Sequence, residues 1–187
     1  MQETEVIDNS EVILRRTSET KKIRMRENFS LDLVKTIYEK TPYPSNKGGF
    51  EKAFAKFADS CTSVRSFLKL LPNTHPFVRF RYIKEDGLTA FYYPDFLVRT
   101  PNEQVFVVET KAEDQLTHPN VKRKHLSAVD WTEKVNKLPP EKRDNAEWSY
   151  VLLGQAFFDD WKKKGASMQE LLEYAKLRSL SVNGGLF

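Results

Sequence analysis

The sequence predicts an α/β domain in which a mixed, mostly antiparallel sheet is flanked by helices. From Phe50 onward, the pattern of apolar residues indicates a helix, three meandering strands, a second helix and a further strand. The chain has 187 residues, of which 40% are hydrophobic, and its 13 Phe, 7 Tyr and 3 Trp favour a packed fold over a disordered one. Because this length suffices to bury one core, we expect one domain.

Residues 1–47 are expected to form a basic N-terminal arm and a helix. Between residues 12 and 26 lie six bases and one acid, a local charge of +5 in a chain whose net charge is +4. The basicity is therefore concentrated in this segment, in which Val12–Leu14 can form a short strand. Asn28 or Ser30 can cap a helix that ends at the Thr-Pro-Tyr-Pro sequence, with its apolar positions at Leu33, Val34 and Ile37.

Residues 48–187 hold the predicted domain. A strongly amphipathic helix begins there, and its apolar face consists of Phe50, Phe54, Phe57, Ala58 and Cys61. Residues 63–71 predict a second helical piece, which ends at Pro72. Three strands are then expected, with an Asp-Gly hairpin turn between the first two, over residues 77–83, 90–99 and 105–111.

The C-terminal part adds a helix, a strand and a final helix. The first helix runs to about Leu138, and its apolar stripe is spaced by three and four residues, at Val121, Lys124, Ala128, Trp131, Val135 and Leu138. A continuous apolar strand follows over 148–153. The capping box from Ser167 to Glu170 then begins the last helix.

Composition excludes several classes of protein. Cys61 is the single cysteine, so an internal disulfide framework is ruled out, and three histidines beside it give little support for a zinc site. Any metal is therefore expected to be held by oxygen, and His118 and His125 are expected in solvated positions. The sequence has no run of 18 apolar residues and no signal peptide, so we expect a cytoplasmic protein with no membrane contact.

Two predicted strands contain charged residues where the alternation requires apolar ones. A period of two places Asp95 on the same face as Leu97, and Glu109 and Lys111 on the same face as Val107. Desolvating a carboxylate without a partner is costly, so such charges persist only when they are paired or bound to a metal. Adjacent antiparallel strands would bring the three side chains within reach of one cation.

These residue types indicate a particular chemistry. Mg²⁺ prefers oxygen ligands, keeps several waters and lowers the pKa of one of them enough to make a nucleophile at neutral pH. Lys111 can orient that water or neutralise the charge that develops on the phosphorane. The pattern therefore predicts hydrolysis of phosphodiester bonds.

Two helical residues have alternative interpretations. Lys124 occupies an apolar-stripe position, from which it can reach a phosphate or a carboxylate, or extend from the end of the stripe into solvent. Glu51 lies at the edge of its helix's apolar face, where it can join a metal shell or remain an ordinary solvated glutamate. The pattern alone leaves both alternatives open.

The chain resembles the PD-(D/E)xK nuclease superfamily at these residues. More narrowly, over about 48–155, it is similar to the C-terminal nuclease region of type III restriction enzyme Res subunits and related helicase-nuclease proteins. The similar segments are Gly48–Phe54, Tyr93–Phe96, Val108–Lys111, Lys124 with Trp131, and Trp148–Tyr150. This resemblance implies a restriction-endonuclease-like α-β-β-β-α-β core with a mixed central sheet flanked by helices.

The resemblance also implies roles for individual residues. Asp95, Glu109 and Lys111 match the family's catalytic set, and Glu51 matches the helix glutamate that commonly joins it. We expect Asp95 and Glu109 to hold Mg²⁺ together with the backbone carbonyl of Thr110, and Glu51 to assist through water. Mn²⁺ can substitute for Mg²⁺ in this interpretation.

The expected function is that of a Mg²⁺-dependent DNA endonuclease domain in a type III restriction-like helicase-nuclease system. Such relatives carry an ATP-driven helicase motor upstream, whereas this chain has no Gly-x-x-x-x-Gly-Lys-Ser/Thr phosphate loop. The motor is therefore expected upstream of residues 1–47, which would link to it, or as a separate partner; a homodimer is a further option. The alternatives are a non-catalytic nucleic-acid-binding or docking domain of a helicase complex, and a nuclease that acts on RNA.

Overall fold

The computed structural model describes residues 15–20, 22–23, 26–43 and 48–183. The expected strand at Val12–Leu14 lies outside the described residues, as do Lys21 and Arg24 of the basic segment. Within the described part of the chain, no helix is both long and apolar enough to cross a membrane.

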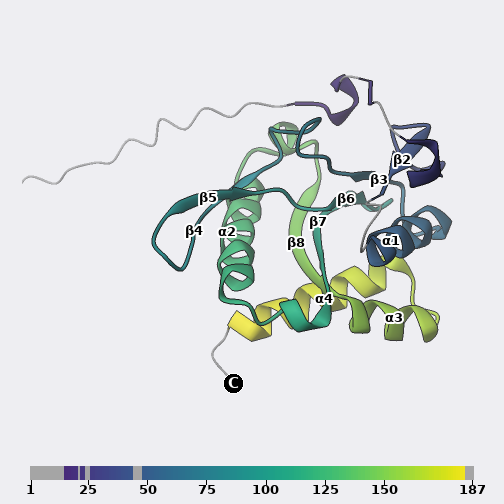
Figure 1. Cartoon of the computed structure of the whole chain (residues 1–187). Coiled ribbons are helices and arrows are strands. Elements are labelled where there is room, and N and C mark those ends of the chain that lie inside the picture. Colours follow the sequence, from purple (N-terminus) through teal and green to yellow (C-terminus); the bar gives the residue numbers. More distant parts are fainter. Residues whose placement is uncertain (1–14, 21, 24–25, 44–47, 184–187) are drawn as a thin grey trace, which may run out of the picture.

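A four-stranded mixed sheet forms the centre of the fold (Figure 1). Its order is β3-β6-β7-β8, in which β3 pairs with β6 and β6 with β7 in antiparallel fashion, while β8 runs parallel to β7. The predicted α/β class with a mixed sheet is therefore confirmed. The four strands span Ser66–Lys69, Phe96–Arg99, Gln104–Lys111 and Glu147–Gly154.

Helices cover both faces of this sheet (Figure 1). Helix α2 packs against β8 on one face. On the other face, α4 packs against β8 and α1 packs against β3. Strand β7 is correspondingly buried on both faces, because Val108 contacts the α1 side and Val107 the α2 side. The α-helices span Gly49–Ser60 (α1), Pro119–Asn136 (α2), Gln155–Lys163 (α3) and Met168–Asn183 (α4).

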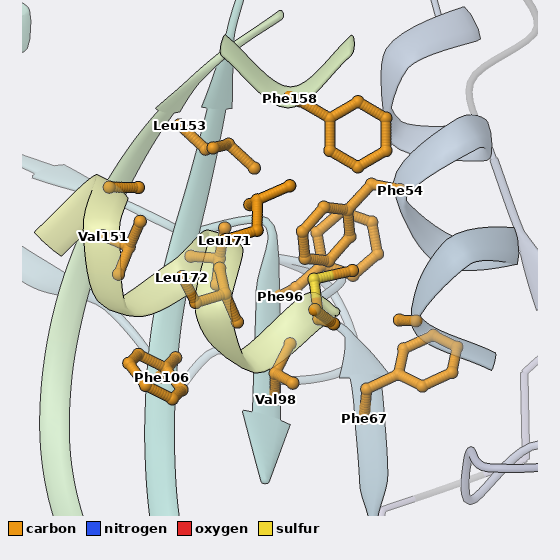
Figure 2. Close-up of a cluster of buried hydrophobic side chains, with 14 of the residues drawn as sticks. Phe54, Phe67, Phe96, Val98, Phe106, Val151, Leu153, Phe158, Leu171 and Leu172 are labelled. Atoms are coloured by element: carbon orange, nitrogen blue, oxygen red, sulfur yellow. The ribbon is translucent and has the colours of Figure 1, made fainter. Parts of the chain in front are cut away.

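The larger core lies between the sheet and α1, α3 and α4 (Figure 2). Phe54, Phe96 and Phe158 are fully buried there, and the Phe54 and Phe96 ring centroids lie 4.7 Å apart. The predicted helix from Phe50 and the capping box at Ser167 are both confirmed, the latter by hydrogen bonds from the Ser167 amide to Glu170 Oε2 (2.8 Å) and from the Glu170 amide to Ser167 Oγ (3.3 Å). Helix α3 has no counterpart among the predicted elements.

The predicted strand over 90–99 is divided in two. Strands β4 (Phe80–Ile83) and β5 (Thr89–Tyr92) form a separate two-stranded hairpin, and the chain then breaks before β6. Pro94 explains the break, because proline has no amide to donate to a sheet ladder. Asp95 therefore precedes β6 instead of lying inside a long strand.

The helical piece predicted over 63–71 is wrong, because Ser66–Lys69 forms strand β3. Short apolar runs suit either a helix or a strand, and here pairing with β6 decides in favour of the strand. Phe67, Leu68 and Lys69 are all buried as a result.

The helix predicted after Asn28 is also wrong. The structure has a small antiparallel pair of strands there, β1 (Ser30–Asp32) and β2 (Lys40–Pro42). Val34 is 89% exposed, so the apolar spacing does not mark a buried face. Asp59 Oδ1 instead accepts hydrogen bonds of 2.8 Å from the backbone amides of Val34 and Lys35.

Short 3₁₀ turns connect several of these elements. In the part of the chain that the structure describes, they lie at Thr17–Glu19, Glu27–Phe29, Glu113–Gln115 and Pro140–Arg143. The third turn, Glu113–Gln115, follows the end of β7. Its Glu113 side chain lies close to Gly154 at the end of β8, because a Cβ atom added at residue 154 would be only 2.8 Å from Glu113 Oε2.

Candidate active site

Asp95 lies directly before β6, beside the end of β7 that carries Glu109. The Asp95 amide donates a 3.0 Å hydrogen bond to the carbonyl of Val108, and the register of β6 and β7 pairs Phe96 with Val108. Asp95 thus lies beside the Val108–Thr110 segment of β7, one residue beyond the last pair of the ladder. The structure thus brings the two predicted carboxylates to the same end of two neighbouring strands.

Thr110 fixes the carboxylate of Asp95. Asp95 Oδ2 accepts a 2.8 Å hydrogen bond from the Thr110 amide and a 2.7 Å bond from the Thr110 hydroxyl. Hydrogen bonds to an ionised acceptor are among the stronger ones in proteins, and two of them on one oxygen define the orientation of the side chain. The sequence suggested only the Thr110 carbonyl as a functional group, and this positioning role was missed.

Glu109 is buried and only partly paired. It is 4% exposed, and its Oε1 lies 2.7 Å from Lys111 Nζ, whereas its Oε2 has no hydrogen-bond partner. The pKa of Glu109 is raised to about 7. Burial is the largest cause, repulsion from Asp95 is the second, and Lys111 opposes the shift. Glu109 therefore changes its charge near neutral pH.

Lys111 lies within the field of all three predicted carboxylates. Burial acts to lower the pKa of Lys111, but Glu109, Asp95 and Glu51 together raise it above its ordinary value. Lys111 is therefore a permanent cation at neutral pH.

A second lysine joins the site from β3. Lys69 Nζ lies 2.8 Å from Glu51 Oε2 and 3.3 Å from Asp95 Oδ1, and it stands 4.8 Å from the centroid of the Phe96 ring. Lys69 thus connects Glu51, in the first turn of α1, to the strand carboxylates. The sequence contained a signal for it, since Lys69 interrupts the apolar run from Phe67 to Leu71, but the helical interpretation of that run concealed which face it occupies.

The cluster as a whole has more negative than positive groups. Its carboxylates are Glu51, Asp95 and Glu109, and its ammonium groups belong to Lys69 and Lys111. With every group ionised, three negative charges and two positive charges leave a formal charge of −1. With Glu109 protonated the formal charge is zero, so an additional cation would be attracted to this site once Glu109 is ionised.

The donor atoms suit a hard metal ion, although the described residues hold no group of three His, Cys, Asp or Glu side chains gathered closely enough to bind one. All the predicted ligands are oxygens, which Mg²⁺ prefers. Glu109 Oε2 is moreover a buried carboxylate oxygen without a hydrogen-bond partner, and such an atom normally has a ligand or water beside it. The residues therefore suit a divalent cation by the chemistry of their donor atoms, and not by their present spacing.

Lys124 lies on the side of the sheet that α2 covers. Its ammonium stands 5.6 Å and 5.4 Å from the ring centroids of Tyr82 and Tyr92, and it is half-buried. Lys124 also acts to lower the pKa of Glu109, which places it within the electrostatic reach of the site. Its contact with a phosphate stays a prediction.

The prediction that His125 is solvated is wrong. The buried residues of α2 are Val121, His125, Ala128 and Thr132, so the stripe is rotated from the predicted one, and Trp131 is 36% exposed. His125 is 4% exposed, and neither ring nitrogen has a hydrogen-bond partner. His118 is exposed as expected, and its Nδ1 accepts a 3.1 Å hydrogen bond from the Asn120 amide at the start of α2.

Comparison of the chain with models of protein families, with curated proteins and with solved structures finds no match in any of the three.

Proposed function

We propose that this chain is a Mg²⁺-dependent nuclease domain that hydrolyses phosphodiester bonds in DNA. One observation carries the proposal: Asp95 and Glu109 come together where β6 begins and β7 ends, because Asp95 Oδ2 accepts a hydrogen bond from the amide of Thr110, the neighbour of Glu109, and Lys111 Nζ lies 2.7 Å from Glu109 Oε1. Two carboxylates and a lysine at one strand end are the groups that metal-assisted phosphodiester hydrolysis requires.

The order of elements supports a restriction-endonuclease-like core. Helix α1, strands β3, β6 and β7, helix α2 and strand β8 follow one another, with the β4–β5 hairpin inserted between β3 and β6. This order agrees with the α-β-β-β-α-β pattern of the PD-(D/E)xK nucleases that the sequence resembles. We include that superfamily in the proposal.

Asp95 and Glu109 would hold the metal, with the Thr110 carbonyl beside them and Glu51 acting through water. When bound, Mg²⁺ supplies Lewis acidity to the phosphate and lowers the pKa of a bound water. Thr110 keeps the Asp95 carboxylate in one orientation, so little rearrangement is needed before the site can act.

Lys111 acts as a fixed cation in this proposal. Its raised pKa keeps the ammonium protonated, so it donates hydrogen bonds to a phosphate oxygen or to the attacking water and does not remove a proton. The pKa of Glu109 near 7 implies that its carboxylate becomes available as a ligand toward the upper part of the neutral range. Lys124 would contact a neighbouring phosphate.

The biological setting belongs to the proposal as well. A nuclease domain of this type would work with an ATP-driven helicase motor, in a type III restriction-like system. This part of the proposal rests on the resemblance, because the relatives that the sequence resembles carry such a motor, whereas this sequence contains no Gly-x-x-x-x-Gly-Lys-Ser/Thr loop.

The test is nicking of supercoiled plasmid DNA by the wild type, Asp95→Ala and Lys111→Ala, each with Mg²⁺ and with EDTA. We expect nicking by the wild type in Mg²⁺ alone and a loss of at least about 100-fold in both variants, the size expected for removing a group that stabilises the transition state. Lys134→Ala is the matched control, because Lys134 is exposed and pairs with Asp130 away from the site.

Each outcome of this test is informative. Equal nicking by the wild type, both site variants and the control would contradict the proposal. DNA binding by all four proteins without nicking would favour the docking-domain alternative. Cleavage of a matched RNA substrate but not of DNA would mean that the domain is a nuclease that acts on RNA.

A further inference from the structure

Lys69, the last residue of the edge strand β3, is an unusual residue to find buried in a sheet. It is 8% exposed and lies on β3 opposite Phe96, and lysines are rarely buried so deeply unless they are paired. Its ammonium contacts two carboxylates that come from different elements, Glu51 from α1 and Asp95 from the start of β6. The proposed hydrolysis assigns it no role.

We propose that Lys69 is a built-in counterion that holds Glu51 and Asp95 in the metal-free protein and competes with the divalent cation for them. This inference rests on the proposed function, because it concerns the same site. A partly buried pair of carboxylates is stabilised by a positive charge between them, and Lys69 supplies one when no metal does. Metal binding must therefore displace the ammonium or work against its charge.

The geometry of the two contacts favours an exchangeable ion pair. Lys69 Nζ lies 2.8 Å from Glu51 Oε2, yet this oxygen has no hydrogen bond of acceptable direction, so the contact is electrostatic and poorly aligned. Its contact with Asp95 Oδ1 is long, at 3.3 Å. By contrast, Asp95 Oδ2 receives two well-formed hydrogen bonds from Thr110. The oxygens that face Lys69 are thus the less firmly held ones.

The inference predicts opposite effects of one substitution. Lys69→Met keeps an unbranched side chain over the Phe96 ring and removes the charge. Without metal, the variant should be less stable than the wild type, because Glu51 and Asp95 lose their shared partner. With metal, it should bind more tightly by at least about tenfold, because a like charge only a few ångströms away is gone.

Calorimetric titration of the full chain with Mg²⁺, and electron paramagnetic resonance with Mn²⁺, measure the affinity without relying on catalysis. Thermal unfolding in EDTA and in saturating Mg²⁺ measures the two stabilities. Lys56→Met is the matched control, because Lys56 lies on the same helix as Glu51 but is exposed. Lys69→Gln is the second variant, since its amide can still donate to the carboxylates if Lys69→Met does not fold.

We expect tighter metal binding and a larger Mg²⁺-induced rise in melting temperature for the Lys69 variants than for the wild type and Lys56→Met. Equal or weaker binding by a folded Lys69 variant would overturn the inference while leaving the proposed function intact. If the wild type binds no metal but a Lys69 variant does, the counterion role is supported in its strongest form. If no folded protein of the set binds metal, both proposals fail.

Discussion

Thr110 donates both its amide and its hydroxyl to a single oxygen of Asp95, at 2.8 Å and 2.7 Å. Thr110 follows Glu109 on β7, so one strand supplies one carboxylate of the site and the groups that orient the other. Rigid support from a neighbouring strand is what a catalytic carboxylate requires if its position is to be reproducible.

Replacing Thr110 with valine should therefore affect both stability and nicking. Thr110→Val keeps the β-branched shape and the amide but removes the hydroxyl, and the loss of a hydrogen bond to a charged group costs about 1.5–3 kcal/mol. We expect a decrease in the free energy of unfolding, measured by urea denaturation, and a severalfold fall in nicking. Thr110→Ser, which retains the hydroxyl, should nick like the wild type; an equal loss in both variants would contradict the positioning role.

Phe54 links the stability of the core to the position of the site. It is fully buried, and its ring packs against Phe96, the residue after Asp95. Phe54→Ala should cost about 3–5 kcal/mol, the typical range for a fully buried phenylalanine, and Phe54→Leu should cost less because it leaves a smaller cavity. Urea unfolding measures both. A loss below about 1 kcal/mol for Phe54→Ala would mean that the core can collapse around the cavity.

The sequence predicted the strand residues of the site because their signal is local. Asp95, Glu109 and Lys111 interrupt apolar strands, and alternation along each strand indicates which residues share a face. Their mutual placement then follows from the pairing of neighbouring strands joined by a short turn, and the structure has that pairing. The helix that presents Glu51 was likewise predictable from its apolar periodicity.

Lys69 and His125 were missed for physical reasons that differ. Lys69 lies in a run too short to distinguish a helix from a strand, and only its pairing with β6, which is distant in the sequence, decides between them. His125 is displaced by a single residue from the predicted stripe of α2, and a rotation of that size depends on how the helix packs against β8. Tertiary contacts of this kind leave no periodic trace in the sequence.

The buried side chain of His125 should lower the stability of the protein. Both ring nitrogens are buried without a partner, and an unsatisfied buried polar group costs about 1–3 kcal/mol. His125→Leu, which has a similar volume and no polar atoms, should therefore raise the free energy of unfolding by about 1 kcal/mol at pH 7. Chemical denaturation measures the change.

The gain from His125→Leu should also grow in acid. Burial lowers the pKa of His125 below its ordinary value of 6.5, so the unfolded chain takes up a proton more readily and wild-type stability falls as the pH drops below about 6.5. His118→Leu is the control, and it should lower the free energy of unfolding, because it removes the acceptor for the Asn120 amide at the start of α2. Lower stability of His125→Leu at pH 7 would mean that the two nitrogens have partners after all.

Glu109 should make the metal-free protein less stable as the pH rises. The pKa of Glu109 is about 7 in the folded protein against an ordinary value of 4.5, so the folded state holds a proton that the unfolded state has lost. The favourable contribution is complete below about pH 4.5 and disappears as the pH rises through about 7. At 1.36 kcal/mol per pH unit, this interval is worth at most about 3 kcal/mol.

Glu109→Gln isolates this effect, because glutamine resembles the protonated acid and does not titrate. In EDTA, the variant should match the wild type near pH 5 and exceed it in free energy of unfolding at pH 8, as measured by urea denaturation across the pH range. Glu133→Gln, an exposed change on α2, should leave the wild-type dependence unaltered. If the wild type and Glu109→Gln lose stability in parallel from pH 5 to pH 8, then Glu109 is ionised throughout that range and its burial is fully compensated by Lys111.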